Sequence, residues 1–356
     1  MLYETFEKIY ALEKQGREIV KLNVGEPDWR PPANVIQAAS GALKKGNDKY
    51  ASSAGELELR EKIAELHGCD AKNIVITTGS KWGIYALLSL HMRAGDSAIV
   101  LSPHWTAYDL ICKQLGAQAK IIDLEMGNKF AIDFDKLESA IGQNTRFIIL
   151  NSPCNPTSKA WSEGEEEEII QIAREKGITV LSDDAYRDLC FDRRKERKFE
   201  NNLFIANTFS KTFGMTGWRV GYLVVPETIA KKLVSLNNIT ITNVPVFLQL
   251  AALKALEQKT KIAEKARETC KKRAELAINI LEEKLTFSKP DAGFYIFPKL
   301  PDGVETMTFV NKLLENGVAV VPGAAFGNYE GHIRISLSVD EKKLRLALEK
   351  IVVLLE

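Results

Sequence analysis

Cysteine and long apolar runs are scarce in this chain of 356 residues. The five cysteines are odd in number and scattered, and none forms a C-x-x-C pair, so we expect reduced thiols and neither disulfides nor a zinc knuckle. No stretch is apolar for long enough to cross a membrane, and residues 1–20 have the charge spacing of an amphipathic helix rather than the core of a signal peptide. These absences predict a cytoplasmic protein that binds no membrane.

The net charge is also close to zero, because the chain has 48 Lys and Arg residues and 47 Asp and Glu residues. No overall field therefore draws the chain to nucleic acid or anionic lipid. The sequence has no H-E-x-x-H, no G-x-G-x-x-G after the first strand and no G-x-x-x-x-G-K-[ST] loop, which disfavours metal hydrolysis and dinucleotide or P-loop enzymes. We expect no metal site, since the four histidines are isolated: His67, His91, His104 and His332.

The composition is that of an ordinary globular protein, with 45% hydrophobic and 27% charged residues, and the length suits two domains. Short apolar runs alternate with helical stretches over 73–226, which predicts an α/β domain with a mostly parallel seven-stranded sheet covered on both sides. A long charged helix near 259–285 should bridge to a small α+β domain. We expect the large domain to span 33–255 and the small one 1–32 plus 256–356. The seven runs are NIVITT, SAIVLS, AKIIDL, RFIILN, TVLSDD, LFIANT and GYLVVP.

Polar residues after these runs are the first candidates for a site, because open parallel sheets bind ligands beyond the carboxyl ends of their strands. After NIVITT comes TTGSKWGIYALL, in which small residues lead into a helix and leave the backbone N–H groups of Ser80 and Lys81 facing an anion. A phosphate fits this position, although a plain helix cap by Ser80 explains the pattern as well.

Two further turns bring an aromatic ring and an amide to the same edge. SPHWTAYDL follows SAIVLS, so Trp105 or Tyr108 either stacks on a flat ligand ring or packs in the core. NSPCNPTS follows RFIILN, and its prolines force a turn that presents Asn155, although turn structure alone explains these residues too.

Asp183 ends the run TVLSDD, which should be buried. A buried carboxylate is costly unless a cation pairs with it, so Asp183 predicts a cationic partner. Tyr186 follows three residues later, close enough to donate a hydrogen bond to the same ligand. By contrast, we interpret the acidic run at Glu163 to Glu168 as the solvated first turn of a helix, where negative charge favours the positive end of the dipole.

The segment NTFSKTFGMTGWRVGY is the most informative one. Lys211 follows LFIANT in a turn, and Arg219 comes eight residues later. Glycines at Gly214, Gly217 and Gly221 permit close backbone approach. A lysine that forms an aldehyde adduct and an arginine that clamps a phosphate need such a compact loop, and the alternative is a surface lysine.

The portion SKTFGMTGWRVGY resembles the pyridoxal-lysine signature of class I aminotransferases, in particular the gamma subgroup that includes many prokaryotic aspartate aminotransferases. This resemblance implies an aspartate-aminotransferase-like fold (pyridoxal-phosphate fold type I), the cofactor pyridoxal 5'-phosphate, and a homodimer with shared active sites. It extends in order along nearly the whole chain, through LNVGEPDW, KYASSAGELELREKIA, TTGSKWGIY, SPHWTAY, NSPCNPTS, SDDAYRDL, the lysine segment, PDAGFYIFP, VPGAAFG and HIRISLS.

The resemblance also implies a role for each matching residue. Lys211 would carry the cofactor as a Schiff base and move the substrate proton, while Asp183 pairs with the pyridine nitrogen. Arg334 would bind the substrate α-carboxylate, a role that its own strand does not reveal, because the alternation in HIRISLS fits any half-solvated strand. The remaining roles are hydrogen bonds to the phenolic oxygen from Tyr186 and Asn155, stacking by Trp105, phosphate binding by Ser80, Lys81, Thr208 and Arg219, a contact from Tyr50 of the neighbouring subunit, and carboxylate contacts from Gly25 and Asn155.

Several positions depart from the family pattern. Ser158 ends NPTS where the family has glycine, Asp184 stands where glutamate is common, and Thr208 stands where a serine often binds phosphate. PDAGFYIF also permutes the usual Gly-Ala order. None of these is a bond-making group, so they question local geometry and not the reaction.

The reaction expected is a ping-pong transamination between an L-amino acid and a 2-oxo acid such as 2-oxoglutarate. Aspartate is favoured, because in some gamma-subgroup enzymes a lysine at the position of Lys81 reaches the distal carboxylate. Aromatic or broad-range amino acids stay open, since Trp29 and Tyr295 could line an apolar pocket. A carbon-sulfur β-lyase or a decarboxylase is the rival enzyme. A transcription regulator is the rival outside enzymes, and we expect none, because its DNA-binding domain would have to precede Val24.

Overall fold

The computed structural model describes residues 2–355, with side chains from Glu7 onward. Its largest sheet has seven strands in the order β2-β8-β7-β6-β5-β3-β4, and only β8 runs antiparallel to its neighbours. Each predicted apolar run forms one of these strands, which confirms the mostly parallel α/β sheet. The strands are β2 (Ile74–Thr77), β3 (Ser97–Ser102), β4 (Gln118–Asp123), β5 (Thr145–Leu150), β6 (Thr179–Asp183), β7 (Leu203–Thr208) and β8 (Gly221–Val224).

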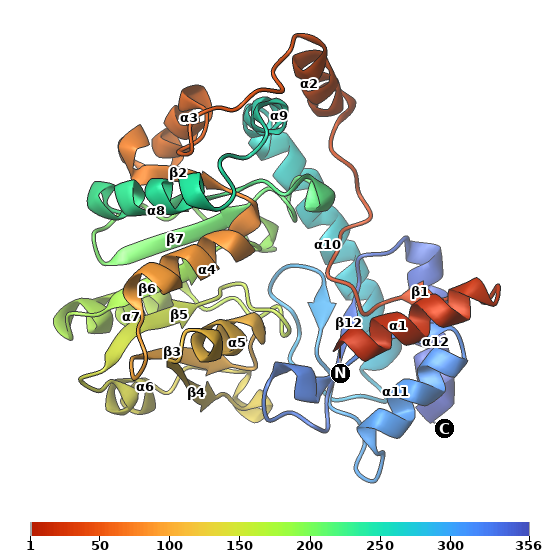
Figure 1. Cartoon of the computed structure of the whole chain (residues 1–356). Helices are drawn as coiled ribbons and strands as arrows, with labels where there is room; N and C mark the ends of the chain where they lie inside the picture. The colour runs from red at the N-terminus through yellow and green to blue at the C-terminus, as the bar shows by residue number, and fades with distance from the viewer. Residues whose placement is uncertain (1, 356) are drawn as a thin grey trace.

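Helices cover both faces of the sheet because successive strand residues point to opposite sides. Ile74 and Ile76 join one core, whereas Val75 between them joins the other. Figure 1 shows α4, α5 and α8 on the near face. The edge strand β4 is the exception, since only Ile122 of its residues is buried. The helices of this part are α2 (Ala33–Lys44), α3 (Leu57–His67), α4 (Gly79–His91), α5 (Ala107–Gln114), α6 (Phe134–Ala140), α7 (Glu163–Glu175), α8 (Glu227–Ile239) and α9 (Val246–Leu256).

The remaining elements pack around a separate core. This smaller part of the chain contains a three-stranded sheet in the order β11-β12-β9 and a two-stranded sheet that pairs β1 with β10. The N-terminal helix α1 joins this part, because Ile9 packs against Leu314 and Ala319. The elements are α1 (Leu2–Lys14), β1 (Val20–Lys21), β9 (Tyr295–Ile296), α11 (Thr306–Glu315), β10 (Val318–Ala319), β11 (Val321–Pro322), β12 (Ile333–Ser336) and α12 (Glu341–Leu355).

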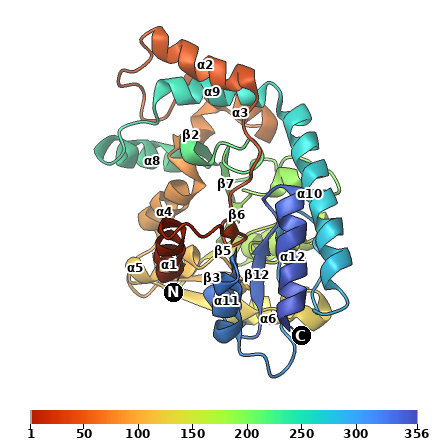
Figure 2. The same cartoon turned by 90° about the vertical axis from the view of Figure 1, so that its right-hand side faces the viewer.

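The long helix α10 (Lys259–Leu281) connects the two parts. It starts beside α9 and runs down to pack against α12, as both Figure 1 and Figure 2 show. The separate cores support our proposal that the domains divide at 33–255 and at 1–32 plus 256–356.

The structure also bears on the scarcity of cysteine and of long apolar runs in the sequence. All five cysteines are free thiols in the structure. Within residues 2–355 no helix is both long and apolar enough to cross a membrane.

Candidate active site

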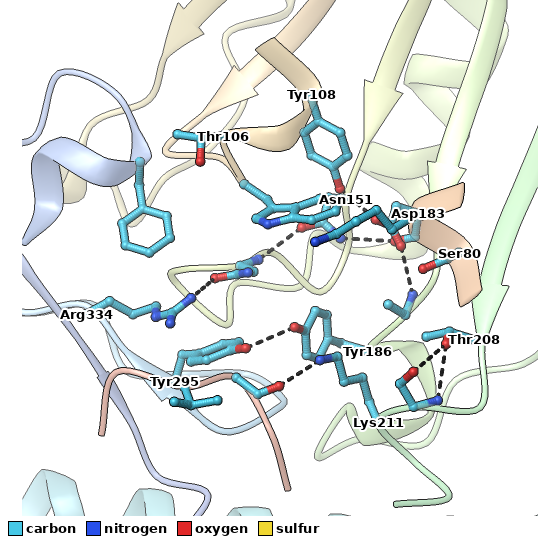
Figure 3. A pocket seen from close by; sticks show the side chains of 18 of the residues that line it. Ser80, Thr106, Tyr108, Asn151, Asp183, Tyr186, Thr208, Lys211, Tyr295 and Arg334 are labelled. Carbon is cyan, nitrogen blue, oxygen red and sulfur yellow. Dashed lines mark hydrogen bonds between the residues drawn. The ribbon is translucent and has the colours of Figure 1, made fainter. Parts of the chain in front are cut away.

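The carboxyl ends of β2, β3, β5, β6 and β7 and the beginning of the antiparallel β8 meet at one edge of the sheet. A pocket of about 360 Å³ opens there, toward β9 and β12 (Figure 3). Every predicted site residue except Tyr50 lines it. The predicted lining residues are Gly25, Ser80, Lys81, Trp105, Asn155, Asp183, Tyr186, Thr208, Lys211, Arg219 and Arg334.

One end of the pocket is a cradle formed by the start of α4. The helix begins at Gly79 directly after β2, so its first N–H groups, including that of Ser80, have no partner inside the helix. Two glycines let neighbours close around this end: a Cβ on Gly221 would lie 2.6 Å from the Ser80 amide nitrogen, and one on Gly79 would lie 2.5 Å from Arg219 Nη2. Free N–H groups beside a guanidinium suit a phosphate.

Hydroxyl groups complete this cradle from β7. Thr208 Oγ1 lies 2.9 Å from Ser210 Oγ and accepts a 3.1 Å hydrogen bond from the Ser210 N–H. Arg219 is fixed in turn, because its Nη1 donates to Thr216 O at 2.8 Å. Ser210 was not predicted, although its place between Thr208 and Lys211 was a usable signal in the sequence.

Asp183 lies deeper in the pocket, at the end of β6. Its side chain is buried, with Oδ2 accepting a 2.7 Å hydrogen bond from Tyr108 OH and Oδ1 accepting a 3.2 Å bond from Ala185 N–H. Burial raises the pKa of Asp183 to about 6 in spite of these donors. None of the ion pairs among the described residues involves Asp183, so a cationic ring nitrogen fits this carboxylate. Tyr108 was predicted only as an aromatic ring and not as the donor that holds Asp183.

Lys211 extends into the same pocket from the turn after β7. Its Nζ donates a 2.7 Å hydrogen bond to Gly25 O. Burial, together with the charge of Arg334, lowers the pKa of Lys211 to about 8. The loop is held from behind by Trp29, whose Nε1 lies 3.2 Å from both Lys211 O and Thr212 O. Trp29 was one possible wall of an apolar pocket, but it is not among the residues that line this pocket, and its ring supports the lysine turn instead.

Arg334 closes the opposite end of the pocket. Its Nη1 donates to Asn155 Oδ1 at 2.9 Å and its Nη2 donates to Asn23 O at 2.7 Å. The guanidinium carbon lies 4.6 Å from the ring centre of Tyr295 and 4.9 Å from that of Phe326. Its buried Nε has no hydrogen-bond partner among the described residues, so Arg334 keeps donor capacity for a carboxylate.

A buried ionic network surrounds Asp184, the residue next to Asp183 in the chain. Asp184 accepts a 3.0 Å hydrogen bond from Arg197 Nε, and Arg197 pairs in turn with Glu166 at 2.9 Å. Glu166 also pairs with Arg187 at 3.1 Å. Although burial opposes ionisation, Arg197 and Arg187 hold the pKa of Asp184 below its usual range. The solvated helix turn expected for the acidic run is therefore wrong for Glu166, whose carboxylate is buried in this network.

Tyr50 is the one predicted site residue outside the pocket. It lies between α2 and α3 and is 89% exposed. It is not among the residues that line the pocket.

Comparisons with known proteins agree with this geometry. The family model described as aminotransferase class I and II matches residues 17–351. The aspartate aminotransferase of Thermococcus kodakarensis is 33% identical over 358 residues, which covers 100% of this chain and 94% of that protein. The aromatic-amino-acid aminotransferase 2 of Thermococcus litoralis is 33% identical over 363 residues, covering 96% and 93%.

A solved structure shares the fold as well. The aspartate aminotransferase from Thermus thermophilus with maleate has a TM-score of 0.91 and 30% identity, and the match covers 99% of this chain and 96% of that one. The cradle at the start of α4, the buried carboxylate and the pocket lysine thus occur in a chain that matches one family over residues 17–351. The chain belongs to the class I and II aminotransferases, which transfer amino groups with pyridoxal phosphate.

Proposed function

We propose that Lys211 is the attachment point of pyridoxal phosphate in this pocket. The observation that carries the proposal is that the Lys211 amine shares one pocket with a buried carboxylate, Asp183, and with a buried arginine, Arg334. The cradle at the start of α4 suits the phosphate, and Asp183 suits the protonated ring nitrogen. Trp105 has a ring available for stacking at the pocket wall.

The other cofactor contacts follow from the same arrangement. Ser80, Lys81, Thr208 and Arg219 would hold the phosphate. The Tyr186 hydroxyl, which lies 3.0 Å from Tyr295 OH, would bind the phenolic oxygen together with Asn155. Arg334 would bind the substrate α-carboxylate, with Asn155 and Gly25 beside it.

In this proposal Lys211 is the acid and base of the reaction. Bound pyridoxal phosphate supplies an electron sink for the electron pair left at the substrate Cα when its proton is removed. With a substrate amino acid bound in this pocket, the Lys211 amine would take up the Cα proton as a base and give it back as an acid. A pKa of about 8 makes the neutral amine accessible near neutral pH, as a general base requires. Arg334 holds a 2-oxo acid in the same orientation for the return half-reaction.

We propose aspartate as the favoured amino donor, with 2-oxoglutarate as an acceptor. The support from this chain is Lys81, which is exposed, lines the pocket and has its Nζ 5.0 Å from the ring centre of Trp105. A cation there suits a second carboxylate on the substrate. Aromatic amino acids are the alternative, which the relative from Thermococcus litoralis and the ring of Tyr295 favour.

Replacing Lys81 by Met tests the substrate choice. If Lys81 binds a distal carboxylate, loss of this charged hydrogen bond raises the KM for aspartate about tenfold or more relative to the KM for phenylalanine. An unchanged ratio of the two KM values contradicts this role. Lys231→Met is the matched control, because Lys231 lies on α8, pairs with Glu227 at 2.8 Å and does not line the pocket.

The reaction type is tested by following the amino group. With wild-type protein, aspartate should convert the bound cofactor to its amino form without release of ammonia. Release of ammonia and pyruvate from a sulfur amino acid would favour the carbon-sulfur β-lyase instead. Lys211→Ala should abolish both the visible cofactor band and turnover, and retention of both overturns the assignment.

We also propose a homodimer in the cytoplasm, in which Tyr50 of one subunit completes the site of the other. The support is the high exposure of the Tyr50 side chain, which leaves it available to a second copy. Sedimentation gives the subunit number, and Tyr50→Phe should weaken cofactor binding although it leaves the chain folded. A fully active monomer contradicts the proposal.

A further inference from the structure

Ser158 adopts a backbone conformation that side chains rarely take. Its φ is 55°, in the left-handed region where glycine is favoured. The residue is nevertheless almost fully buried, and its N–H donates to Cys154 O at 2.8 Å. Because a strained conformation persists only where the surroundings hold it, the contacts of this side chain are informative.

The Ser158 hydroxyl is bonded to the strand that carries Tyr295. Tyr295 N–H donates to Ser158 Oγ at 3.1 Å, and Asp291 N–H donates to Ser158 O at 3.1 Å. Gly293 lies against the same hydroxyl with a φ of 60°, and a Cβ there would be 3.3 Å from Ser158 Oγ. The permuted order of Ala292 and Gly293 therefore leaves the space that the Ser158 hydroxyl occupies.

Tyr295 in turn lies between two groups of the proposed site. Figure 3 shows it between Arg334 and Tyr186. Its ring centre is 4.6 Å from the Arg334 guanidinium carbon, and its hydroxyl is 3.0 Å from Tyr186 OH. A Cβ on Gly25 would overlap the Tyr295 hydroxyl, so this ring has little room to shift.

We propose that Ser158 is a positioning residue, which seats Tyr295 so that it aligns both Arg334 and Tyr186. The inference rests on the proposed function, in which Arg334 binds the α-carboxylate and Tyr186 binds the phenolic oxygen of the cofactor. Ser158 and the Ala292-Gly293 order act as a matched pair, because Gly293 has no side chain and so leaves the space that the Ser158 hydroxyl fills. Loss of the hydroxyl deprives the buried Tyr295 N–H of its acceptor and loosens both contacts of the ring.

Ser158→Gly separates this role from a purely structural one. Glycine relieves the strain at a φ of 55° but removes the acceptor, so stability should stay close to that of the wild type while the site changes. We expect the Kd for the dicarboxylate maleate to rise about tenfold, which corresponds to about 1.4 kcal/mol. The pH midpoint of the visible cofactor band should rise by about 0.5 to 1 unit, because a weaker Tyr186 donor stabilises the phenolic oxygen anion less.

Two further variants locate the effect. Tyr295→Phe keeps the ring against Arg334 and the bond to Ser158, so it should raise the midpoint of the band and change maleate binding less. Ser152→Ala is the matched control, because Ser152 is also buried and its Oγ accepts a backbone N–H, that of Trp161 at 3.2 Å, but it lies outside the pocket. It should lower stability and leave both site measurements as in the wild type.

The outcomes are distinct. A Ser158→Gly protein that binds maleate and titrates like the wild type overturns the inference, and so does a Ser152→Ala protein with the same site changes. If the pH midpoint of the cofactor band is the same in Tyr295→Phe as in the wild type, Tyr295 does not act on the cofactor through Tyr186. A wild-type protein that shows no cofactor band removes the proposed function itself, and this inference with it.

Discussion

Removing the Tyr108 hydroxyl tests whether that group holds the buried charge of Asp183. Tyr108 OH donates to Asp183 Oδ2 at 2.7 Å, and both side chains are buried. The pKa of Asp183 is raised by burial from 3.8 to about 6, which corresponds to a cost of about 3 kcal/mol for its ionised form. In the absence of cofactor this cost is missing at low pH, appears as the pH rises from about 4 to 6, and stays constant above that window.

Tyr108→Phe should increase this cost only where Asp183 is ionised. At pH 8 the variant loses a hydrogen bond to a charged group, about 1.5–3 kcal/mol, whereas at pH 4 it loses a neutral one, about 0.5–1.5 kcal/mol. The pKa of Asp183 rises further, so the window in which stability falls extends to higher pH. Urea unfolding of the cofactor-free variant and wild type at both pH values measures the difference.

Tyr329→Phe is the control for this experiment. Tyr329 OH lies 2.7 Å from both Ser102 O and Leu124 O and donates its one hydrogen to this pair of carbonyls, neither of which titrates. The loss of stability in Tyr329→Phe should therefore be equal at pH 4 and pH 8. An equally pH-independent loss in Tyr108→Phe refutes the reasoning about Asp183.

Two further substitutions test opposite ends of the pocket. Gly221→Ala should weaken cofactor binding, because the added Cβ would lie 2.6 Å from the Ser80 nitrogen and the overpacking costs about 1–3 kcal/mol. Gly217→Ala is the control, because a Cβ there would meet nothing within 4 Å, and titration should show unchanged cofactor binding. Arg334→Gln should raise the KM for amino acids by a factor that corresponds to about 2–5 kcal/mol, whereas replacement of the exposed Arg345 by Gln should leave the KM unchanged. Steady-state assays in which Arg334→Gln and the wild type have equal KM values contradict the carboxylate role.

The sheet and most of the pocket could be predicted from the sequence for a physical reason. Strands buried on both faces appear as short apolar runs, and the residues after each run meet at one edge of a parallel sheet. Asp183 ends such a run, and Asn155 and Lys211 each follow one, so the local sequence places all three at the same edge. Arg334 required the family resemblance, because a buried strand of the smaller part looks like a half-solvated one.

The missed features depend on contacts between distant segments. Tyr108 bonds Asp183 across two strands, and Glu166 pairs with arginines in a loop more than twenty residues away. Trp29 lies near Lys211 only because the N-terminal segment folds back over the lysine turn. No local pattern of hydrophobicity or turn residues reports such pairings, so they became visible only in the folded chain.

The attachment of the cofactor to Lys211 can be tested directly by covalent trapping. The protein is loaded with pyridoxal phosphate, reduced with borohydride and digested, and the modified peptide is identified by mass spectrometry. We predict one pyridoxyl group per chain on Lys211, within the peptide that contains SKTFGMTGWR. Labelling of Lys81 or another lysine in place of Lys211, or no stable label at all, contradicts the proposed site.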